Sequence, residues 1–181
     1  MFLVQMSGVP GAGKSTVAAY VGRVYGAVVV DYDVIKSAVL DAGFGLGEST
    51  KAAYEVMYAQ SRHVLRQGLD VVMDSPCFWP RILDEGMAIA GECGATYRYI
   101  ECQLADLTVL DERLRQRVRL RTHRRGVGHP PVDVGDELED GEAFYRGAID
   151  RVRRPAEGYL QLNMERPLSE VLPEVDAYLK S

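Results

Sequence analysis

The sequence has few cysteines, no long apolar run and no basic N-terminal region, and each absence argues against a class of protein. The three cysteines among 181 residues, Cys77, Cys93 and Cys102, show neither C-x-x-C spacing nor a partner histidine, which argues against a disulfide framework and a zinc site. We expect reduced, mostly buried thiols in a cytoplasmic protein. No apolar run is long enough to cross a membrane, and the N-terminus shows no secretory signal.

The charge balance and the length narrow the possibilities further. The net charge is −5, with 26 Asp and Glu residues against 21 Lys and Arg residues, and an acidic chain argues against a large nucleic-acid surface. The length fits one domain, residues 1–181, with a full-sized core. We therefore expect neither nucleic acid nor a membrane as a partner, and the sequence does not indicate an oligomeric state.

The most informative stretch is GVPGAGKST, which fits the phosphate-binding pattern G-x-x-x-x-G-K-[ST], the P-loop. It lies between an apolar run at residues 2–6 and a helical pattern at residues 16–25, which is the strand–loop–helix setting that the motif needs. Its glycines let backbone N–H groups point at a phosphate, beside the positive end of the helix dipole. The expected nucleotide-binding residues are Gly8, Pro10, Gly11, Ala12, Gly13, Lys14, Ser15 and Thr16.

Two side chains of this loop have expected chemical tasks. Lys14 supplies positive charge to the β- and γ-phosphates, and the Ser15 hydroxyl is placed to bind Mg²⁺. The sequence therefore predicts a site for a nucleoside triphosphate and magnesium.

Three aspartates follow two further predicted strands. Asp31 and Asp33 come after the apolar residues 27–30, and Asp74 comes after residues 70–73. Ligands bind at the carboxyl ends of the strands in parallel sheets, and carboxylates there suit both Mg²⁺ water shells and a base that activates a hydroxyl. Other interpretations stay open, because Asp33 could cap the helix that follows it and Asp74 could cap a turn or a helix.

An arginine-rich segment follows Asp106, where helical spacing predicts an apolar face made of Leu107, Leu110, Leu114 and Val118. A turn-rich stretch, residues 126–131, comes next, and a basic helix before a mobile loop is typical of a lid that closes over phosphates. Within this predicted lid, residues 113–135, three arginines are spaced by four and are expected to share a face: Arg113, Arg117 and Arg121. We expect at least one of them to contact phosphate; the alternative is a solvated basic face.

The rest of the pattern predicts helices at residues 50–67, 81–90, 142–153 and 168–179, and strands at residues 95–102 and 159–163. Ser49 is the expected N-cap of the first of these helices, after a glycine-rich loop. Trp79 either forms the wall of a pocket or plugs the edge of the core. Residues 133–140 are acidic and turn-like.

This order of elements resembles the P-loop kinases over nearly the whole chain. It is most similar to the small kinases that act on a hydroxyl: shikimate and gluconate kinases, chloramphenicol phosphotransferase, zeta toxins and the phage-type 5′-polynucleotide kinase. Many of their relatives are labelled AAA-family ATPases. The resemblance implies a three-layer α/β P-loop NTPase fold with a five-stranded parallel sheet of order 2-3-1-4-5, helices on both faces and an arginine-rich lid. It also implies ATP and Mg²⁺ as cofactors.

The resemblance implies roles for single residues as well. Asp33 would hold the acceptor hydroxyl as the candidate base, with Asp31 nearer the metal, and Lys36 matches a basic substrate contact. Asp74 would serve both the metal and the substrate, although Asp74-Ser75-Pro76 replaces the glycine-rich loop of shikimate kinases and is closer to the polynucleotide-kinase and zeta-toxin type. The catalytic residues implied in this way are Lys14, Asp33, Arg117 and Arg121.

We expect an ATP-dependent kinase that phosphorylates a hydroxyl of a small molecule, such as a sugar, a nucleoside or an antibiotic. Two alternatives stay open. A polynucleotide 5′-kinase would need a basic channel with stacking aromatic residues, and a nucleotide-dependent switch would hydrolyse ATP slowly or not at all. The remaining length does not fit a second AAA+ domain, so an oligomeric motor is not expected.

Overall fold

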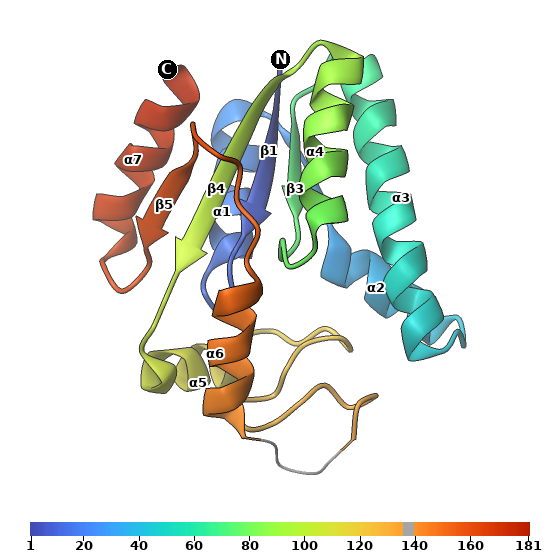
Figure 1. The fold of residues 1–181 in the computed structure, drawn as a ribbon, viewed down its shortest axis with the longest axis vertical. Coiled ribbons are helices and arrows are strands. Elements are labelled where there is room, and N and C mark those ends of the chain that lie inside the picture. The colour runs from blue at the N-terminus through green and yellow to red at the C-terminus, as the bar shows by residue number, and fades with distance from the viewer. Residues whose placement is uncertain (136–139) are drawn as a thin grey trace.

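The fold is built on a parallel sheet of five strands. The computed structural model describes residues 1–135 and 140–181, and every strand pairing within them is parallel. The order β2-β3-β1-β4-β5 confirms the order implied by the P-loop kinases (Figure 1). The strands are β1 (Phe2–Ser7), β2 (Val28–Asp31), β3 (Val71–Asp74), β4 (Thr96–Gln103) and β5 (Leu160–Asn163).

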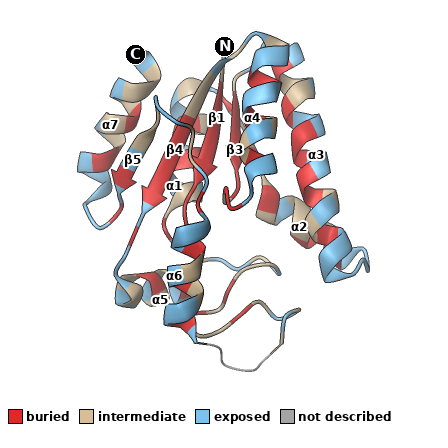
Figure 2. Ribbon diagram, in the orientation of Figure 1, coloured by how far each residue is buried: buried red, intermediate tan, exposed pale blue. Residues whose placement is uncertain are grey.

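Helices cover both faces of this sheet, as expected. In the described residues they are α1 (Lys14–Tyr25), α2 (Tyr32–Asp41), α3 (Leu46–Arg66), α4 (Pro80–Cys93), α5 (Leu107–Gln116), α6 (Gly141–Arg151) and α7 (Leu168–Lys180). Side chains alternate along the central strand β1, so Leu3 packs with α3 and α4 while Val4 and Met6 pack with α1 and α7. Figure 2 shows the resulting buried strands between exposed outer helix faces. The chain therefore has three layers around two apolar cores.

The parallel strands define one edge of the sheet where a ligand could bind. All five strands run the same way, so the carboxyl ends of β1, β2 and β3 meet at one edge. The helices α5 and α6 lie beyond that edge, together with the segment that follows α5 (Figure 1). This is the edge at which parallel sheets bind ligands.

The start of α3 differs from the prediction. Gly45 is the N-cap, and the Glu48 carboxylate accepts a hydrogen bond from its N–H group at 3.2 Å. Ser49, the expected cap, lies buried inside the first turns. The capping-box glutamate thus decides where this helix begins.

The end of α5 also differs. The helix stops at Gln116 because the backbone of Arg117 is extended, with φ −69° and ψ 152°. The expected common face of the three arginines is therefore wrong, since Arg117 and Arg121 lie beyond the helix. Val118 is 93% exposed and does not continue the apolar face of Leu110 and Leu114.

The other boundaries agree with the sequence to within a few residues. The helix expected at 81–90 extends over Pro80–Cys93, and the helix expected at 142–153 ends at Arg151. Of the acidic stretch at 133–140, residues 136–139 lie outside the described part of the chain. All three cysteines are free, and Cys77 and Cys102 are buried. Among the described helices, none is long and apolar enough to span a bilayer.

Candidate active site

The P-loop has the backbone shape that its sequence predicts. Gly8, Gly11 and Gly13 adopt positive φ angles of 129°, 86° and 100°, which favour glycine. A Cβ atom at Gly8 would lie 2.3 Å from the carbonyl oxygen of Cys102, so the loop can approach β4 only without a side chain. No side chain caps the start of α1, and its first N–H groups are left for an anion.

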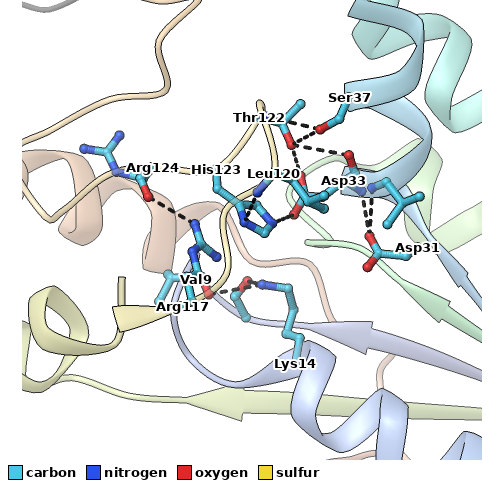
Figure 3. Close-up of polar contacts among 12 residues, drawn as sticks. Val9, Lys14, Asp31, Asp33, Ser37, Arg117, Leu120, Thr122, His123 and Arg124 are labelled. Carbon is cyan, nitrogen blue, oxygen red and sulfur yellow. Dashed lines mark hydrogen bonds and ion pairs between the residues drawn. The ribbon is translucent and has the colours of Figure 1, made fainter. Parts of the chain in front are cut away.

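Lys14 folds over this loop. Its Nζ atom donates to the carbonyl oxygens of Gly8 at 3.0 Å and Val9 at 3.1 Å (Figure 3). The positive charge is thereby held beside the phosphate cradle. Its charge also acts on two carboxylates: with His123 it lowers the pKa of Asp33, and it opposes the rise in the pKa of Asp74 that burial causes.

Asp31 is the cap of α2. Its Oδ1 atom accepts from the N–H groups of Asp33 at 2.8 Å and Val34 at 3.2 Å. The alternative interpretation, in which Asp33 caps this helix, is therefore wrong. Burial and then the neighbouring charge of Asp33 raise the pKa of Asp31, and the two amides only partly offset the rise.

Asp33 is left to face the cavity. Its Oδ1 atom accepts from Thr122 Oγ1 at 3.1 Å, its Oδ2 atom lies 3.6 Å from His123 Nε2, and its side chain is 37% exposed. Partial burial would raise its pKa, but the neighbouring His123 imidazole, the charge of Lys14 and the hydrogen bond from the Thr122 hydroxyl outweigh burial and lower the pKa. The carboxylate is therefore ionised at neutral pH and accessible, as a base for a hydroxyl must be.

Asp74 lies across from Asp31 in the β2–β3 register and is only 4% exposed. Burial raises its pKa to about 6, against the attraction of Lys14 and the nearby Ser15 hydroxyl. Its Oδ2 atom is buried and has no hydrogen-bond partner among the described residues. An unpartnered buried carboxylate oxygen is a suitable ligand for a cation or an ordered water.

The donors at this edge fit Mg²⁺ better than they fit a metal held wholly by protein. In the part of the chain that the structure describes, no group of three or more His, Cys, Asp or Glu side chains could enclose a metal. Mg²⁺ keeps several waters and uses one or two carboxylates together with phosphate oxygens. Asp74 and the exposed Ser15 hydroxyl suit that mode of binding.

One pocket of about 580 Å³ joins the P-loop to Asp33, a volume within the usual range for small-molecule sites. From the P-loop it is lined by Pro10, Gly11, Gly13, Lys14, Ser15 and Thr16. From the other elements its polar lining includes Asp33, Arg113, Arg117, Thr122, His123 and Arg124. Gly8 and Ala12 belong to the loop but do not line the pocket. Ala12 is fully buried in the core.

A family model described as an AAA domain matches residues 3–129, which hold the P-loop, the three aspartates and the arginine-rich segment. The chain belongs to this AAA-domain family. A comparison with curated proteins finds no match.

Solved structures show which fold this AAA-domain chain shares. A gluconokinase from Sinorhizobium meliloti 1021 is 16% identical, with a TM-score of 0.63, and the alignment covers 99% of this chain and 91% of that one. A sugar kinase from a Janibacter species is 14% identical over 99% and 95%, with a TM-score of 0.64. The APS kinase CysC of Mycobacterium tuberculosis, in complex with AMPPNP and APS, is 18% identical over 99% and 98%, with a TM-score of 0.62. The chain has the fold of the P-loop kinases.

The lid arginines of the AAA-domain chain divide into two groups. Arg113 donates to the carbonyl oxygen of Met164 at 2.8 Å and lines the pocket. Arg117 also lines it, donates to the carbonyl oxygen of Arg124 at 3.3 Å, and has a buried Nε atom without a hydrogen-bond partner in the described chain. Burial lowers the pKa of Arg117.

Arg121 lies elsewhere. Its guanidinium donates to both carboxylate oxygens of Asp133, at 2.9 and 2.6 Å, and to Asp41 at 3.0 Å. The structure places it outside the pocket lining. The implied catalytic role of Arg121 is therefore not supported, because its charge is used to tie the lid to α2.

Two further expected residues lie beside the pocket rather than in its lining. The Lys36 Nζ atom lies 5.7 Å from the centre of the Tyr32 ring. The Trp79 ring contacts the Tyr54 ring edge-on, with centroids 6.3 Å apart, and remains 49% exposed. Trp79 therefore borders the core of α3 and does not line this pocket.

Sequence reasoning missed Thr122, His123 and Tyr145. Thr122 and His123 interrupt a run of arginines, and only that interruption could have drawn attention to them. Tyr145 is 1% exposed, and its hydroxyl donates to the carbonyl oxygen of Pro10 at 3.0 Å. Nothing in the local pattern links α6 to the P-loop.

Proposed function

We propose that this chain is an ATP-dependent phosphotransferase that moves the γ-phosphoryl group to a hydroxyl of a small molecule, such as a sugar, a nucleoside or an antibiotic. The observation that carries the proposal is that the accessible carboxylate of Asp33 lines the same pocket as the P-loop. A switch that only binds nucleotide needs the phosphate cradle but has no need of a base facing it.

The reaction follows from these positions. The P-loop amides bind the phosphates. The oxygen of the acceptor hydroxyl bonds to the γ-phosphorus, and Asp33 accepts the proton that this hydroxyl loses. The bond from the γ-phosphorus to the bridging oxygen breaks, and ADP leaves. Lys14 and Arg117, both at the pocket wall, neutralise the charge that develops on the transferred group.

Ser15 and Asp74 would hold Mg²⁺, with Asp31 acting through water. When bound, the ion neutralises charge on the β- and γ-phosphate oxygens. The unpartnered Oδ2 atom of Asp74 supports this assignment.

The names of the similar structures support a small acceptor. A gluconokinase, a sugar kinase and an APS kinase share the fold over at least 91% of their own chains. The APS kinase is in complex with AMPPNP and APS, which favours a nucleotide donor and a small acceptor here too. The net charge of −5 favours neither a nucleic-acid channel nor a membrane surface.

The test is transfer of labelled γ-phosphate from ATP, with Mg²⁺, to a panel of sugars, nucleosides, antibiotics and a 5′-hydroxyl oligonucleotide. Lys14→Ala is expected to abolish transfer in a folded protein and to weaken ATP binding by roughly 1.5–3 kcal/mol, the value of a charge-assisted contact. Lys51→Ala, at an exposed lysine of α3, is the matched control.

Each outcome of the panel decides between functions. Label on a small molecule supports the proposal, and label on the oligonucleotide alone supports a polynucleotide kinase instead. ATP binding without transfer to any acceptor supports the switch. Full transfer activity in Lys14→Ala contradicts the proposed site.

A further inference from the structure

The segment at residues 117–124 carries two polar side chains that converge on the candidate base. Figure 3 shows Thr122 and His123 pointing at Asp33, while Arg117 of the same segment lines the pocket together with the P-loop. The two contacts join residues that are 89 and 90 positions apart in the chain. The segment therefore spans the space between the phosphate cradle and the base.

Thr122 binds the first two turns of α2 through a directed chain of hydrogen bonds. Its hydroxyl lies 3.1 Å from Asp33 Oδ1 and 3.2 Å from Ser37 Oγ, and its N–H group donates to Ser37 Oγ at 3.3 Å. A hydroxyl has one proton to donate, and the charged carboxylate is the stronger acceptor. The Thr122 proton thus goes to Asp33, the Ser37 proton goes to Thr122, and the backbone of Thr122 satisfies Ser37.

His123 is mounted in a fixed orientation. The Nδ1 atom of its ring accepts from the backbone N–H group of Leu120 at 3.1 Å, and the backbone N–H group of His123 donates to the carbonyl oxygen of Leu120 at 3.0 Å. An Nδ1 atom that accepts a hydrogen bond leaves the imidazole proton on Nε2. That Nε2–H group faces Asp33 Oδ2 at 3.6 Å, and the side chain of His123 is only 14% exposed.

We propose that Thr122 and His123 are positioning residues, which orient the Asp33 carboxylate toward the acceptor hydroxyl. The inference rests on the proposed phosphotransfer function. Thr122 holds Oδ1 by a hydrogen bond of ordinary length, whereas the 3.6 Å contact to His123 leaves room at Oδ2. The proton of the acceptor hydroxyl therefore goes to Oδ2.

The same segment couples the base to the nucleotide. Arg117 lines the pocket and donates to the backbone of Arg124, one residue beyond His123. A displacement of the segment would withdraw Arg117 from the phosphates and both positioning residues from Asp33 together. Transfer to an acceptor therefore depends on this segment more strongly than ATP binding does.

Four variants test the proposal. Thr122→Val and His123→Ala remove the contacts, whereas Thr122→Ser keeps the hydroxyl and His123→Gln keeps a donor near the position of Nε2. Turnover, the KM for the acceptor, the ATP dissociation constant and the ratio of transfer to ATP hydrolysis are measured for each. Thr108→Val and His63→Ala, at exposed positions of α5 and α3, are the matched controls.

We expect Thr122→Val and His123→Ala each to lower kcat for transfer by about 10–100-fold, as loss of a supporting contact commonly does. ATP affinity should stay within about twofold, hydrolysis by water should fall less than transfer does, and Thr122→Ser should recover most of the loss. In an Asp33→Asn background the same substitutions should have no further effect, because their action passes through that carboxylate.

The opposite results are equally clear. If the wild-type protein transfers phosphate and kcat is unchanged in both Thr122→Val and His123→Ala, the positioning role is overturned while the proposed function stands. Losses that add fully to that of Asp33→Asn, or that appear equally in ATP affinity, show that the contacts only dock the lid and also overturn it. Absence of transfer by the wild-type protein to every acceptor overturns the proposed function, and the positioning role with it.

Discussion

At the residue scale, the three aspartates at the sheet edge differ in what surrounds each carboxylate. Asp31 accepts two backbone hydrogen bonds at the start of α2, Asp74 is buried beneath the pocket, and Asp33 alone is accessible in it. Burial raises the pKa of Asp74, whereas His123 and the other partners lower that of Asp33, which is only partly buried. Neighbouring carboxylates that are driven apart in pKa commonly perform different tasks.

Asp33→Asn is expected to lower transfer by about 10²–10⁴-fold, the usual contribution of a general base. ATP affinity should change little, and the fold should be retained because Asp31 caps the helix. Asp31→Asn, in contrast, should keep the cap and raise the Mg²⁺ requirement. The measurement is turnover against Mg²⁺ concentration, with ATP affinity, for both variants.

A matched control for Asp33→Asn is Asp150→Asn, at an exposed position of α6. Normal turnover of Asp33→Asn on an identified acceptor would mean that another group takes the proton, and Asp74 would be the next candidate.

Asp74→Asn is expected to stabilise the nucleotide-free protein at neutral pH. The folded-state pKa of about 6 lies above the ordinary value of 3.8, so the wild-type protein loses stability as pH rises through this interval. At pH 7.5 the charged, buried carboxylate costs on the order of 3 kcal/mol at most, at about 1.4 kcal/mol for each pH unit. The amide avoids this cost, so the gain should be largest above pH 6 and vanish below pH 4.

Denaturation of both proteins at pH 7.5 and pH 4, without nucleotide or Mg²⁺, checks this prediction. The same variant should lose transfer activity. A lower stability of Asp74→Asn at pH 7.5 would show that the carboxylate has a stabilising partner in the folded protein.

At the element scale, the segment after α5 is held by side chains rather than by a continuous helix. Arg121 binds Asp133 and Asp41 at one end, and Arg117 binds the backbone of Arg124 inside the segment. The arginines are therefore not equivalent. Arg113 and Arg117 line the pocket beside the P-loop, and Arg121 secures the lid to α2.

Arg117→Ala and Arg121→Ala should therefore have different kinetic effects. Loss of Arg117 removes a charge from the pocket wall, where we propose that it stabilises the transferred group, and should lower kcat by about 10²–10³-fold, as loss of a stabilising donor does. Loss of Arg121 breaks exposed ion pairs, which contribute little on their own, and should leave kcat within a few-fold. Steady-state kinetics of both variants decide the point, and equal losses would contradict the division.

Hydrogen exchange across residues 113–135 should slow when ATP and Mg²⁺ are added. Lys14, Arg113 and Arg117 place like charges around one pocket, so they repel until an anion binds between them. The exchange of α3, which lies away from the pocket, is the internal control. Unchanged protection of the lid on saturation with ATP would show that its arginines form only a solvated face.

At the scale of the whole molecule, two long-range contacts connect the lid side to the sheet. The buried Glu101 of β4, 3% exposed, accepts from Arg154 at 2.6 and 2.7 Å and from Gln161 of β5 at 3.2 Å. Arg154 follows α6, whose Tyr145 binds the P-loop carbonyl of Pro10. The helix α6 is thus attached to the P-loop through its middle and to the sheet through the residues that follow it.

Glu101→Gln is expected to destabilise the fold by about 2 kcal/mol at pH 7, less than the loss for a fully buried pair because Arg154 is 32% exposed. Burial opposes the charge of Glu101, but the hydrogen bonds from Arg154, Gln161 and Gln103 outweigh burial and lower its pKa. A lowered folded-state pKa stabilises above the ordinary value of 4.5, and that stabilisation is lost as pH falls through the lowered value.

Urea denaturation of the wild-type protein, Glu101→Gln and the exposed control Glu157→Gln at pH 7 and pH 3 tests this. The difference between wild type and Glu101→Gln should shrink at pH 3. A constant difference at both pH values would assign the loss to packing and not to charge.

The sequence by itself determined the P-loop, the parallel sheet and the position of the candidate base. Each of these depends on local chemistry: the loop needs glycine where φ is positive, the buried strands need apolar runs, and Asp33 directly follows a strand. Such requirements appear within a few residues of one another and can therefore be recognised without the fold.

Only the tertiary structure decided which polar side chains meet. The contacts of Thr122 and His123 with Asp33 and of Tyr145 with Pro10 join residues at least 89 positions apart, and no local spacing encodes such a pairing. The expected helical face of the lid arginines was wrong for the same reason. The helical spacing of the sequence continues past Gln116, but the helix ends there. The tertiary fold places Arg117 in the pocket lining and pairs Arg121 with Asp41 and Asp133, and helix propensity does not determine such placements.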